Sequence, residues 1–432
     1  MKILGITSHV SGVHDNSVAL LEDGKVLFAE AEERISRIKH DGRFPWLAIR
    51  ETLKFTKTSF RGIDFIISSN PDESLLRMFI TSLKFIPSVG LPKYFGYIVK
   101  RFFNKIEMLP NYNFPRSYNE AGLPADKLIK VSHYLAHAAT AYYFGPFDKS
   151  LVVNMDGFGP GGNGEPLSGE IYLGENGKLT SLEKVPVWGT LGLYYGAVTK
   201  ALGFKLNDGE GKTMGLAAYG NSTKAYKEMK LFFPEFNGRW FVRKSIMDIL
   251  NIARPNLYEN SETMKFLKDL IVKYGRENVA ASCQRVFEEN LLKYIEYLVR
   301  KYKIRNVSAA GGIFLNIKAN MKLLEEKIVD DLFVYPSPTD GGAALGAALI
   351  GFILRGRKIK RRELVHPAYG RKYSNAEILS ELKSSLGVTY KKLGKNLPLR
   401  VAKLLTEGKV IGWFQGRGEW GPRALGQRSV IA

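Results

Sequence analysis

Two histidines four residues apart carry the clearest chemical signal in the sequence. His133 and His137 follow Ser132, which suits the N-cap position, at the start of an apolar segment predicted to be helical. Residues i and i+4 lie on one face of a helix, so both imidazoles can reach one metal ion. A carboxylate would complete a site with open positions. Asp340 is the first candidate for it, and Asp156 is the alternative. Two inert, hydrogen-bonded histidines are the competing interpretation.

A glycine-rich segment at residues 203–215 has the composition of a phosphate-binding loop. Gly211 would let the backbone approach a phosphate closely, and Lys212 could neutralise its charge. Asp208 or Glu210 could hold ribose hydroxyls or a metal-bound water. The segment predicts a nucleotide site, with a plain turn as the alternative because a lone glycine-rich loop is a weak signal.

Three arginines lie among glycines in the segment GRGEWGPRALGQRS, residues 416–429. The guanidinium groups of Arg417, Arg423 and Arg428 suit bidentate binding of phosphate oxygens. We therefore expect the three side chains to meet at one phosphate. A surface loop with solvated charges is the alternative.

The elements that must position these residues form a repeated pattern. Apolar runs at residues 3–6, 18–21 and 26–31 are joined by a polar loop and a tight turn. The same pattern, with a glycine-rich loop, returns at residues 151–155 and 171–173. The repeat predicts the duplicated α/β fold of actin-like (ribonuclease H-like, sugar-kinase-like) ATPases, with two polar loops facing one cleft.

Two later strands, 307–310 and 332–335, each lead towards a Gly-Gly pair and a helix, where a nucleotide could approach the backbone. A basic stretch follows from Arg355, and a new α/β segment begins near His366. The chain stops at the start of an apolar strand, and we expect from this that the second domain is truncated.

The composition is that of a globular protein with a basic excess. The 432 residues include 63 Lys and Arg against 42 Asp and Glu, a formal +21 that favours nucleotides, phosphorylated substrates or nucleic acid. A basic, aromatic stretch at about residues 70–110 predicts a helical insertion, with an acceptor-binding or RNA-facing surface as the alternative. With one cysteine, Cys283, and no visible targeting or membrane-spanning segment, we expect a soluble cytoplasmic protein without a membrane partner.

Several motifs together resemble the O-carbamoyltransferase family of the nodulation-protein and antibiotic-tailoring type. They are, in chain order, HDNSVALLEDGKVLFAEAEERISRIKHDGRFP, SHYLAHAA, VNMDGFG, GEGKTMGLAAYG, AAGGIFLN, PSPTDGGAALGAA and GRGEWGPRALGQRS. The resemblance implies an actin-like carbamoyl-transfer domain over residues 1–354, akin to the tRNA threonylcarbamoyl-transferring subunit. A basic linker at 355–365 and an incomplete carbamoyl-adenylate-forming domain at 366–432 would follow.

The resemblance implies that carbamoyl phosphate and ATP, with Mg²⁺ on the ATP, give carbamoyl adenylate in the second domain. A hydroxyl of a small-molecule acceptor would then attack the carbonyl in the first domain. The bound metal would be Fe²⁺, with Zn²⁺ and Mn²⁺ as alternatives. An RNA-modifying transferase, a sugar kinase and a non-catalytic nucleotide-binding protein are the competing functions.

The same resemblance assigns residues to roles. His14 would accept the hydroxyl proton, and Lys39 would stabilise carbamoyl or phosphate oxygens. The metal ligands would be His133, His137 and Asp340. The residues implied around the nucleotide are Asp208, Glu210, Gly211, Lys212, Gly311, Gly312 and Asn316. Those implied around carbamoyl phosphate are Arg417, Arg423 and Arg428.

Overall fold

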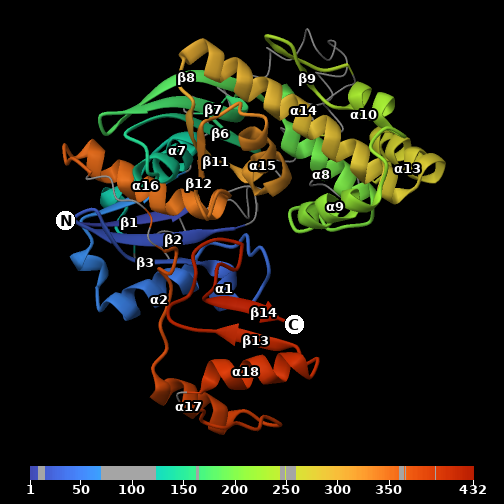
Figure 1. The fold of residues 1–432 in the computed structure, drawn as a ribbon. Helices are drawn as coiled ribbons and strands as arrows, with labels where there is room; N and C mark the ends of the chain where they lie inside the picture. The colour runs from blue at the N-terminus through green and yellow to red at the C-terminus, as the bar shows by residue number, and fades with distance from the viewer. Residues whose placement is uncertain are drawn as a thin grey trace.

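The computed structural model describes most of the chain (Figure 1). The described residues are 1–7, 15–69, 123–161, 165–243, 249, 259–359, 364, 366–394 and 396–432. His14 and the whole of the predicted insertion at about residues 70–110 lie outside them, as do residues 360–363 and 365 of the predicted linker.

Two five-stranded sheets repeat one topology. The first has the order β3-β2-β1-β4-β5, and its strands are β1 (Lys2–Thr7), β2 (Ser17–Glu22), β3 (Lys25–Ala31), β4 (Phe65–Ser68) and β5 (Leu128–Lys130). The second has the order β8-β7-β6-β11-β12, and its strands are β6 (Lys149–Pro160), β7 (Pro166–Glu175), β8 (Lys178–Pro186), β11 (Asn306–Ala310) and β12 (Asp331–Val334). In each sheet the first three strands are antiparallel neighbours and the last two run parallel to the first. This is the duplicated, actin-like α/β fold that the sequence repeat predicted.

Strand β1 shows why the apolar runs are continuous rather than alternating. Leu4 and Ile6 belong to one buried cluster, whereas Ile3 belongs to another on the opposite face. Successive side chains of a strand point to opposite faces, so a sheet covered on both sides requires apolar residues at every position. Helices therefore cover both faces of the first sheet.

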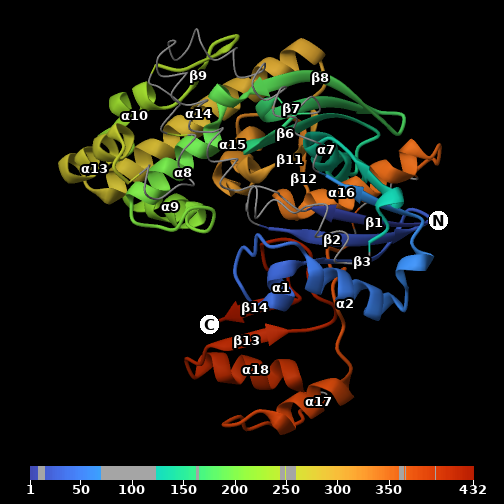
Figure 2. The ribbon, with the colours of Figure 1, turned by 180° about the vertical axis from the view of Figure 1, so that it is seen from behind.

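Two helices lie between the sheets and pack against each other (Figures 1 and 2). Helix α7 (His133–Tyr143) contacts β6 and β11 of the second sheet, and helix α16 (Asp340–Leu354) contacts β1, β2 and β4 of the first. A Cβ added to Gly346 of α16 would lie 1.7 Å from the carbonyl oxygen of Ala136 in α7. A Cβ on Gly5 of β1 would lie 1.9 Å from the carbonyl oxygen of Ala344. Only glycine permits these approaches, so small residues set the spacing of the layers.

The remaining helices cover the outer faces. Helix α2 (Trp46–Thr56) packs on β2 and β3, with the short α1 (Glu32–Ser36) beside it, and α8 (Leu191–Ala201) packs on β6. The other elements of this part are α9 (Glu210–Leu216), α10 (Tyr226–Phe232), β9 (Glu235–Phe236), β10 (Trp240–Phe241), α13 (Glu262–Tyr274), α14 (Arg276–Tyr302) and α15 (Ile317–Glu325). Among the described residues, no helix combines the length and apolar character needed to cross a bilayer.

The C-terminal segment (residues 366–432) docks beside β3, the edge strand of the first sheet. It contains α17 (Asn375–Ser384), α18 (Leu397–Thr406) and the antiparallel pair β13 (Ile411–Phe414) and β14 (Arg428–Ile431). The amide of Ala29 in β3 donates to the carbonyl of Tyr369 at 3.1 Å. The side chain of Arg417 donates to the carbonyl of Leu27 at 2.9 Å. These bonds satisfy backbone groups that an open sheet edge would expose.

A buried carboxyl group lies in this docking contact. Glu30 of β3 is 7% exposed, and its carboxylate lies against Gly370 and Gly418 of the C-terminal segment. Burial raises the pKa of Glu30 to about 7, although the positive charge of Arg34 opposes the shift. The docked segment therefore excludes water from a group that holds its proton close to neutral pH.

We predict that Glu30→Gln reduces the pH dependence of stability. The folded chain holds the proton of Glu30 up to pH about 7, whereas the unfolded chain releases it near its ordinary pKa of 4.5. The wild type should therefore lose stability relative to Glu30→Gln as the pH rises from 4.5 through 7. The loss should be at most about 3 kcal/mol. Denaturant unfolding at several pH values measures the difference, with Glu22→Gln on the neighbouring strand as control. Parallel curves for wild type and Glu30→Gln would contradict the prediction.

Candidate metal and nucleotide site

The two predicted histidines open helix α7. Ser132 is the N-cap, and its hydroxyl accepts from the amide of Leu135 at 3.4 Å, as the sequence predicted. One turn later the Thr140 hydroxyl donates to the His137 carbonyl at 2.7 Å. Both imidazoles are buried, with ring centroids 4.6 Å apart. The helix start therefore holds the two rings on one face, within reach of one point.

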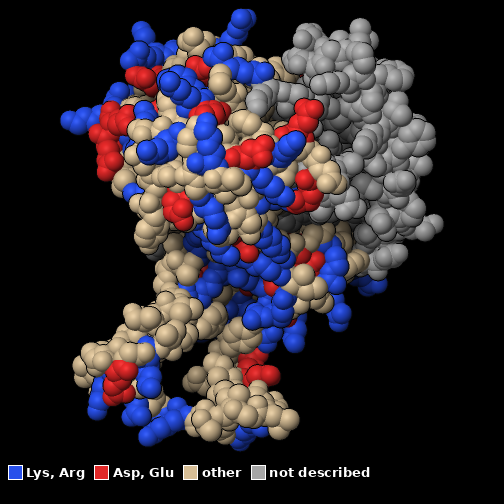
Figure 3. Space-filling view, turned by 90° about the vertical axis from the view of Figure 1, so that its right-hand side faces the viewer, with Lys and Arg blue, Asp and Glu red and all other residues tan. Residues whose placement is uncertain are grey.

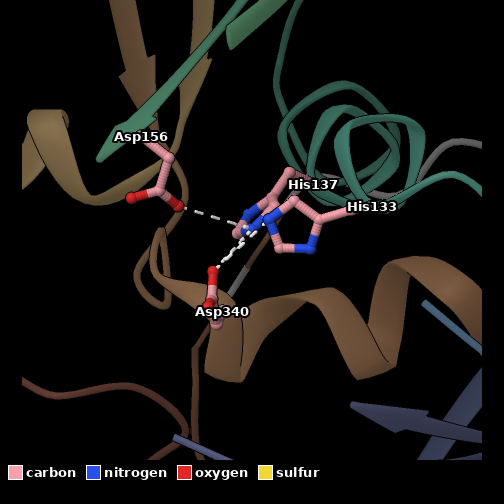
Figure 4. Close-up of side chains that lie close together, drawn as sticks. All are labelled: His133, His137, Asp156 and Asp340. Atoms are coloured by element: carbon pink, nitrogen blue, oxygen red, sulfur yellow. Dashed lines mark hydrogen bonds and ion pairs between the residues drawn. The ribbon is translucent and has the colours of Figure 1, made fainter. Parts of the chain in front are cut away.

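Two carboxylates, from different elements, face these rings (Figure 4). Asp340 is the first residue of α16, and its Oδ1 lies 3.5 Å from His133 Nε2 and 3.3 Å from His137 Nε2. Asp156, on β6, places Oδ2 3.8 Å from His137 Nε2. The sequence treated Asp340 and Asp156 as alternatives, whereas the structure brings both to the histidines. One ligand atom from each of the four residues lies within 4.8 Å of the others.

The spacing of these atoms fits ligands around one metal ion. Donor atoms about 2.1 Å from a tetrahedral ion lie roughly 3.4 Å apart, whereas direct hydrogen bonds are about 2.7–3.0 Å long. The measured separations of 3.3, 3.5 and 3.8 Å match the first case better. Burial, with the negative charges of Asp156 and Asp340, also raises the pKa of the neighbouring Tyr134 well above its ordinary value. The field at this place therefore favours a cation.

Glycines leave the space that the four side chains occupy. A Cβ on Gly159 of β6 would lie 2.8 Å from the ring of His133. A Cβ on Gly312 would lie 3.0 Å from Asp156 Oδ1. Gly311 has a φ of +96°, and its Cβ would lie 1.9 Å from the carbonyl oxygen of Met155. The predicted nucleotide glycines, Gly311 and Gly312, thus lie beside the carboxylate of Asp156.

Asn316, predicted to line the nucleotide pocket, has a structural role here. Its Oδ1 accepts from the amide of Ala319 at 3.1 Å and so caps α15. Its side chain also exchanges two hydrogen bonds with Gln284, at 2.9 and 3.0 Å. These bonds use both ends of the amide, so contact with a nucleotide stays a prediction.

The glycine-rich segment forms the loop and first turn of α9. Glu210 opens the helix, and its carboxylate accepts from the amide of Asn207 at 2.9 Å. Asp208 and Lys212 are exposed, and Gly211 lies between them in the chain. A Cβ on Gly211 would lie 3.5 Å from Nη2 of Arg423, so an arginine from the C-terminal segment reaches this cluster.

Lys39 and a histidine that the sequence reasoning missed connect this cluster to the first sheet. Lys39 Nζ lies 3.8 Å from Asp208 Oδ1. His40 Nε2 lies 3.6 Å from the same oxygen, and His40 Nδ1 lies 2.8 Å from Asp15 Oδ1. Its backbone amide donates to Glu33 at 2.9 Å. His40 therefore lies between carboxylates of the two halves of the fold. The sequence did offer one indication of a functional role for His40: it directly follows Lys39 within the motif that begins at His14.

Two of the three predicted phosphate-binding arginines are bound to the backbone. Arg417 donates to the carbonyls of Leu27, Tyr369 and Gly370. Arg428 donates to the carbonyls of Glu419, Gly421 and Arg423. Burial lowers the pKa of both side chains. Of the three arginines, only Arg423 is exposed. The structure therefore does not show the three guanidinium groups meeting at one phosphate-binding point. Binding of carbamoyl phosphate stays a prediction.

Comparison with protein families agrees with this arrangement. Residues 2–349 match the family described as carbamoyltransferase N-terminus, and residues 402–432 match carbamoyltransferase C-terminus. The chain belongs to the carbamoyltransferase family.

Among its relatives, an uncharacterized protein of Synechocystis sp. is 31% identical, over 99% of this carbamoyltransferase chain and 70% of the relative. Nodulation protein NolNO of Sinorhizobium fredii is 28% identical, over 100% of this chain and 62% of its own length. Nodulation protein NolO of Bradyrhizobium diazoefficiens is 32% identical, over 70% of this chain and 53% of its own length. The chain thus spans about half to 70% of these relatives.

Solved structures give more distant likenesses. Full-length HypF in a phosphate- and nucleotide-bound form is 14% identical with a TM-score of 0.47, over 83% of this chain and 56% of HypF. Component A of (R)-2-hydroxyglutaryl-CoA dehydratase from Acidaminococcus fermentans is 14% identical with a TM-score of 0.44, over 83% of this chain and 100% of its own length. At these scores, the fold assignment rests on the strand order described above.

We predict that the purified carbamoyltransferase chain binds one divalent transition metal ion through the four clustered side chains. His137→Ala and Asp340→Asn should each weaken binding of Zn²⁺ or Mn²⁺ by at least about 100-fold, because each removes a direct ligand. His366→Ala, in the C-terminal segment, is the control. Isothermal titration after chelator treatment measures the affinity. Equal affinity in His137→Ala and wild type would show that the histidines are only hydrogen-bonded.

Proposed function

We propose that the chain transfers a carbamoyl group from ATP-derived carbamoyl adenylate to a hydroxyl of a small-molecule acceptor. The convergence of His133, His137, Asp156 and Asp340, in a member of the carbamoyltransferase family, carries the proposal. A metal ion held there, Fe²⁺ with Zn²⁺ or Mn²⁺ as alternatives, would supply Lewis-acid stabilisation of phosphate oxygens.

The transfer step needs a base and an oriented acceptor. The acceptor oxygen forms a bond to the carbamoyl carbon, the bond from that carbon to the phosphate oxygen breaks, and AMP leaves. His14 would take the proton of the hydroxyl, since an imidazole titrates near neutral pH. Asp15, the next residue, lies 2.8 Å from His40 Nδ1 through its Oδ1. Lys39 would stabilise negative charge on the oxygens of the reacting group.

The nucleotide would lie along the loop that opens α9. Lys212 is exposed there, and Arg423 lies against Gly211, so two cations are available to one phosphate. Asp208 and Glu210 would orient ribose hydroxyls or the Mg²⁺ of ATP. Gly311 and Gly312 let the chain pass close to Asp156, which supports the proposal that they line the nucleotide pocket.

The charge of the surface is consistent with anionic substrates. Lys and Arg side chains gather where the C-terminal segment joins the rest of the molecule (Figure 3). A formal charge of +21 supports binding of nucleotides and carbamoyl phosphate, and equally supports a second candidate function, carbamoyl-type transfer to RNA.

We further propose a division of labour along the chain. Residues 1–354 would perform the transfer, 355–365 would link, and 366–432 would belong to the part that forms carbamoyl adenylate from carbamoyl phosphate and ATP. The carbamoyltransferase N- and C-terminal family matches support the order of these parts.

The proposal is tested by assaying its two half-reactions separately: formation of carbamoyl adenylate and transfer of the carbamoyl group. Formation of carbamoyl adenylate from ATP, water and ¹³C-labelled carbamoyl phosphate, with release of phosphate and pyrophosphate, is followed by NMR. Transfer is followed with carbamoyl adenylate supplied by a separate adenylate-forming enzyme, in the presence of Fe²⁺. The acceptors are a panel of polyhydroxylated small molecules, with total tRNA in a parallel sample. We expect a labelled carbamate ester on a small molecule. Label only in tRNA would favour the second candidate, and label in neither would refute both.

We predict that His14→Asn lowers the rate of transfer by at least about 100-fold, because the general base is lost. Formation of carbamoyl adenylate by a full-length enzyme that carries the same change should be unaffected, and His9→Asn in the same segment should change neither reaction. Equal loss of both half-reactions in His14→Asn would contradict the division of labour.

A further inference from the structure

The loop at residues 416–429, here called the arginine loop, reaches into the core beside the metal ligands. Trp420 is 2% exposed and belongs to the same buried cluster as Tyr335, which follows strand β12. Its backbone amide donates to the carbonyl of Pro367 at 2.7 Å. Residues 335–340, the Asp340 loop, run from Tyr335 to the metal ligand Asp340. The C-terminal segment therefore contacts the loop that presents this ligand.

The contact is closest at Gly421. A Cβ added there would lie 2.4 Å from the carbonyl oxygen of Pro336 and 3.3 Å from the Cα of Ser337. Both neighbours are backbone, which cannot swing away as a flexible side chain could. Gly421 also has a φ of +111°. The arginine loop thus lies directly against the Asp340 loop, three residues before the ligand.

The Asp340 loop is also contacted by the residue that follows β11 and by helix α16. The amide of Gly311 donates to the carbonyl of Pro338 at 2.7 Å. A Cβ on Gly342 would lie 1.9 Å from the carbonyl oxygen of Ser337. The Asp340 loop is therefore enclosed between the second sheet, helix α16 and Gly421. A displacement at any of these contacts would move Asp340 relative to the histidines.

The arginine loop is itself fixed. Glu419 is 1% exposed, and its carboxylate accepts from the amides of Leu425 at 2.9 Å and Gln427 at 3.0 Å. Arg34, from helix α1, donates to the carbonyl of Gly421 at 3.4 Å. The side chain of Arg428 donates to the same carbonyl. These hydrogen bonds fix the position of Gly421, so the arginine loop forms a rigid surface against which the Asp340 loop packs.

We propose that Trp420 and Gly421 are positioning residues for the metal site, through which the C-terminal segment sets the metal affinity of the first domain. The proposal rests on the metal centre proposed above. Groups that orient metal ligands commonly change affinity by about 10–100-fold when altered. By linkage, metal binding should in turn stabilise the docked arginine loop.

Two glycines of the arginine loop provide a matched test. Gly421 and Gly426 have φ values of +111° and +110°, so alanine at either position meets the same unfavourable positive φ. Only at Gly421 would the added methyl group meet other atoms, because nothing lies within 4 Å of a Cβ on Gly426. Isothermal titration of full-length chains with Zn²⁺ and Mn²⁺ measures Kd. We expect Gly421→Ala to raise Kd roughly tenfold and Gly426→Ala by less than about twofold.

The outcomes separate the two proposals. A wild type that binds neither ion refutes the metal centre and this inference with it. A wild type that binds, with both glycine variants equal to it or equally weakened, overturns only the inference. If Gly421→Ala does not fold by circular dichroism, Arg34→Gln decides, since it removes a hydrogen bond to Gly421 from a partly exposed side chain. A two- to three-fold or larger rise in Kd for Arg34→Gln supports the proposal. An unchanged Kd overturns it.

Discussion

The contact between helices α7 and α16 is the constraint on which the site depends. Gly346 allows the backbone of α16 to pass against the carbonyl of Ala136, and both helices begin at the same end of this contact. A larger residue at 346 would separate them, because a close-packed interior has no room for an added methyl group. The first residues of the two helices are His133 and Asp340, so the spacing of the layers becomes the spacing of the ligands. The geometry of the site is therefore set by backbone packing beside His137 in α7 and more than one helical turn into α16.

The secondary-structure elements that depend on local periodicity could be predicted from the sequence. The strands of both repeats, the N-cap at Ser132 and the helix carrying the two histidines follow from alternation, turn residues and i, i+4 spacing, and the structure confirms them. The local pattern could not decide between Asp340 and Asp156, because Asp156 lies on β6, Asp340 follows β12, and only the pairing of both strands with β11 brings the two carboxylates to the same edge. His40 was missed for a similar reason. Its φ of +55° turns the chain so that the ring lies between Asp15 and Asp208, and no periodicity encodes such a turn.

The arginine loop shows what composition alone leaves open. Three arginines among glycines indicate an anion site when the loop is considered alone, because the cations repel one another without a counter-charge. In the structure, Arg417 and Arg428 donate to backbone carbonyl groups, and the buried carboxyl groups of Glu30 and Glu419 lie close by. The glycines then serve a different purpose, allowing the loop to approach β3 and the Asp340 loop. The carbonyls that bind Arg417 come from segments distant in the sequence, which a local pattern cannot show, so the docking role emerged only from the fold.

The charges of the four clustered side chains bear on whether a metal ion and a phosphate would bind at the site together. Two carboxylates beside two imidazoles, nearly all of them buried, are costly without a compensating positive charge. A divalent ion would balance Asp156 and Asp340 and leave the site close to neutral. The N-termini of α7 and α16 would then add partial positive charge, which disfavours a bare cation but favours an anion beside it. A phosphate oxygen beside the ion would satisfy both conditions. The charges around the site are therefore consistent with the proposal that a metal ion and a phosphate bind there together.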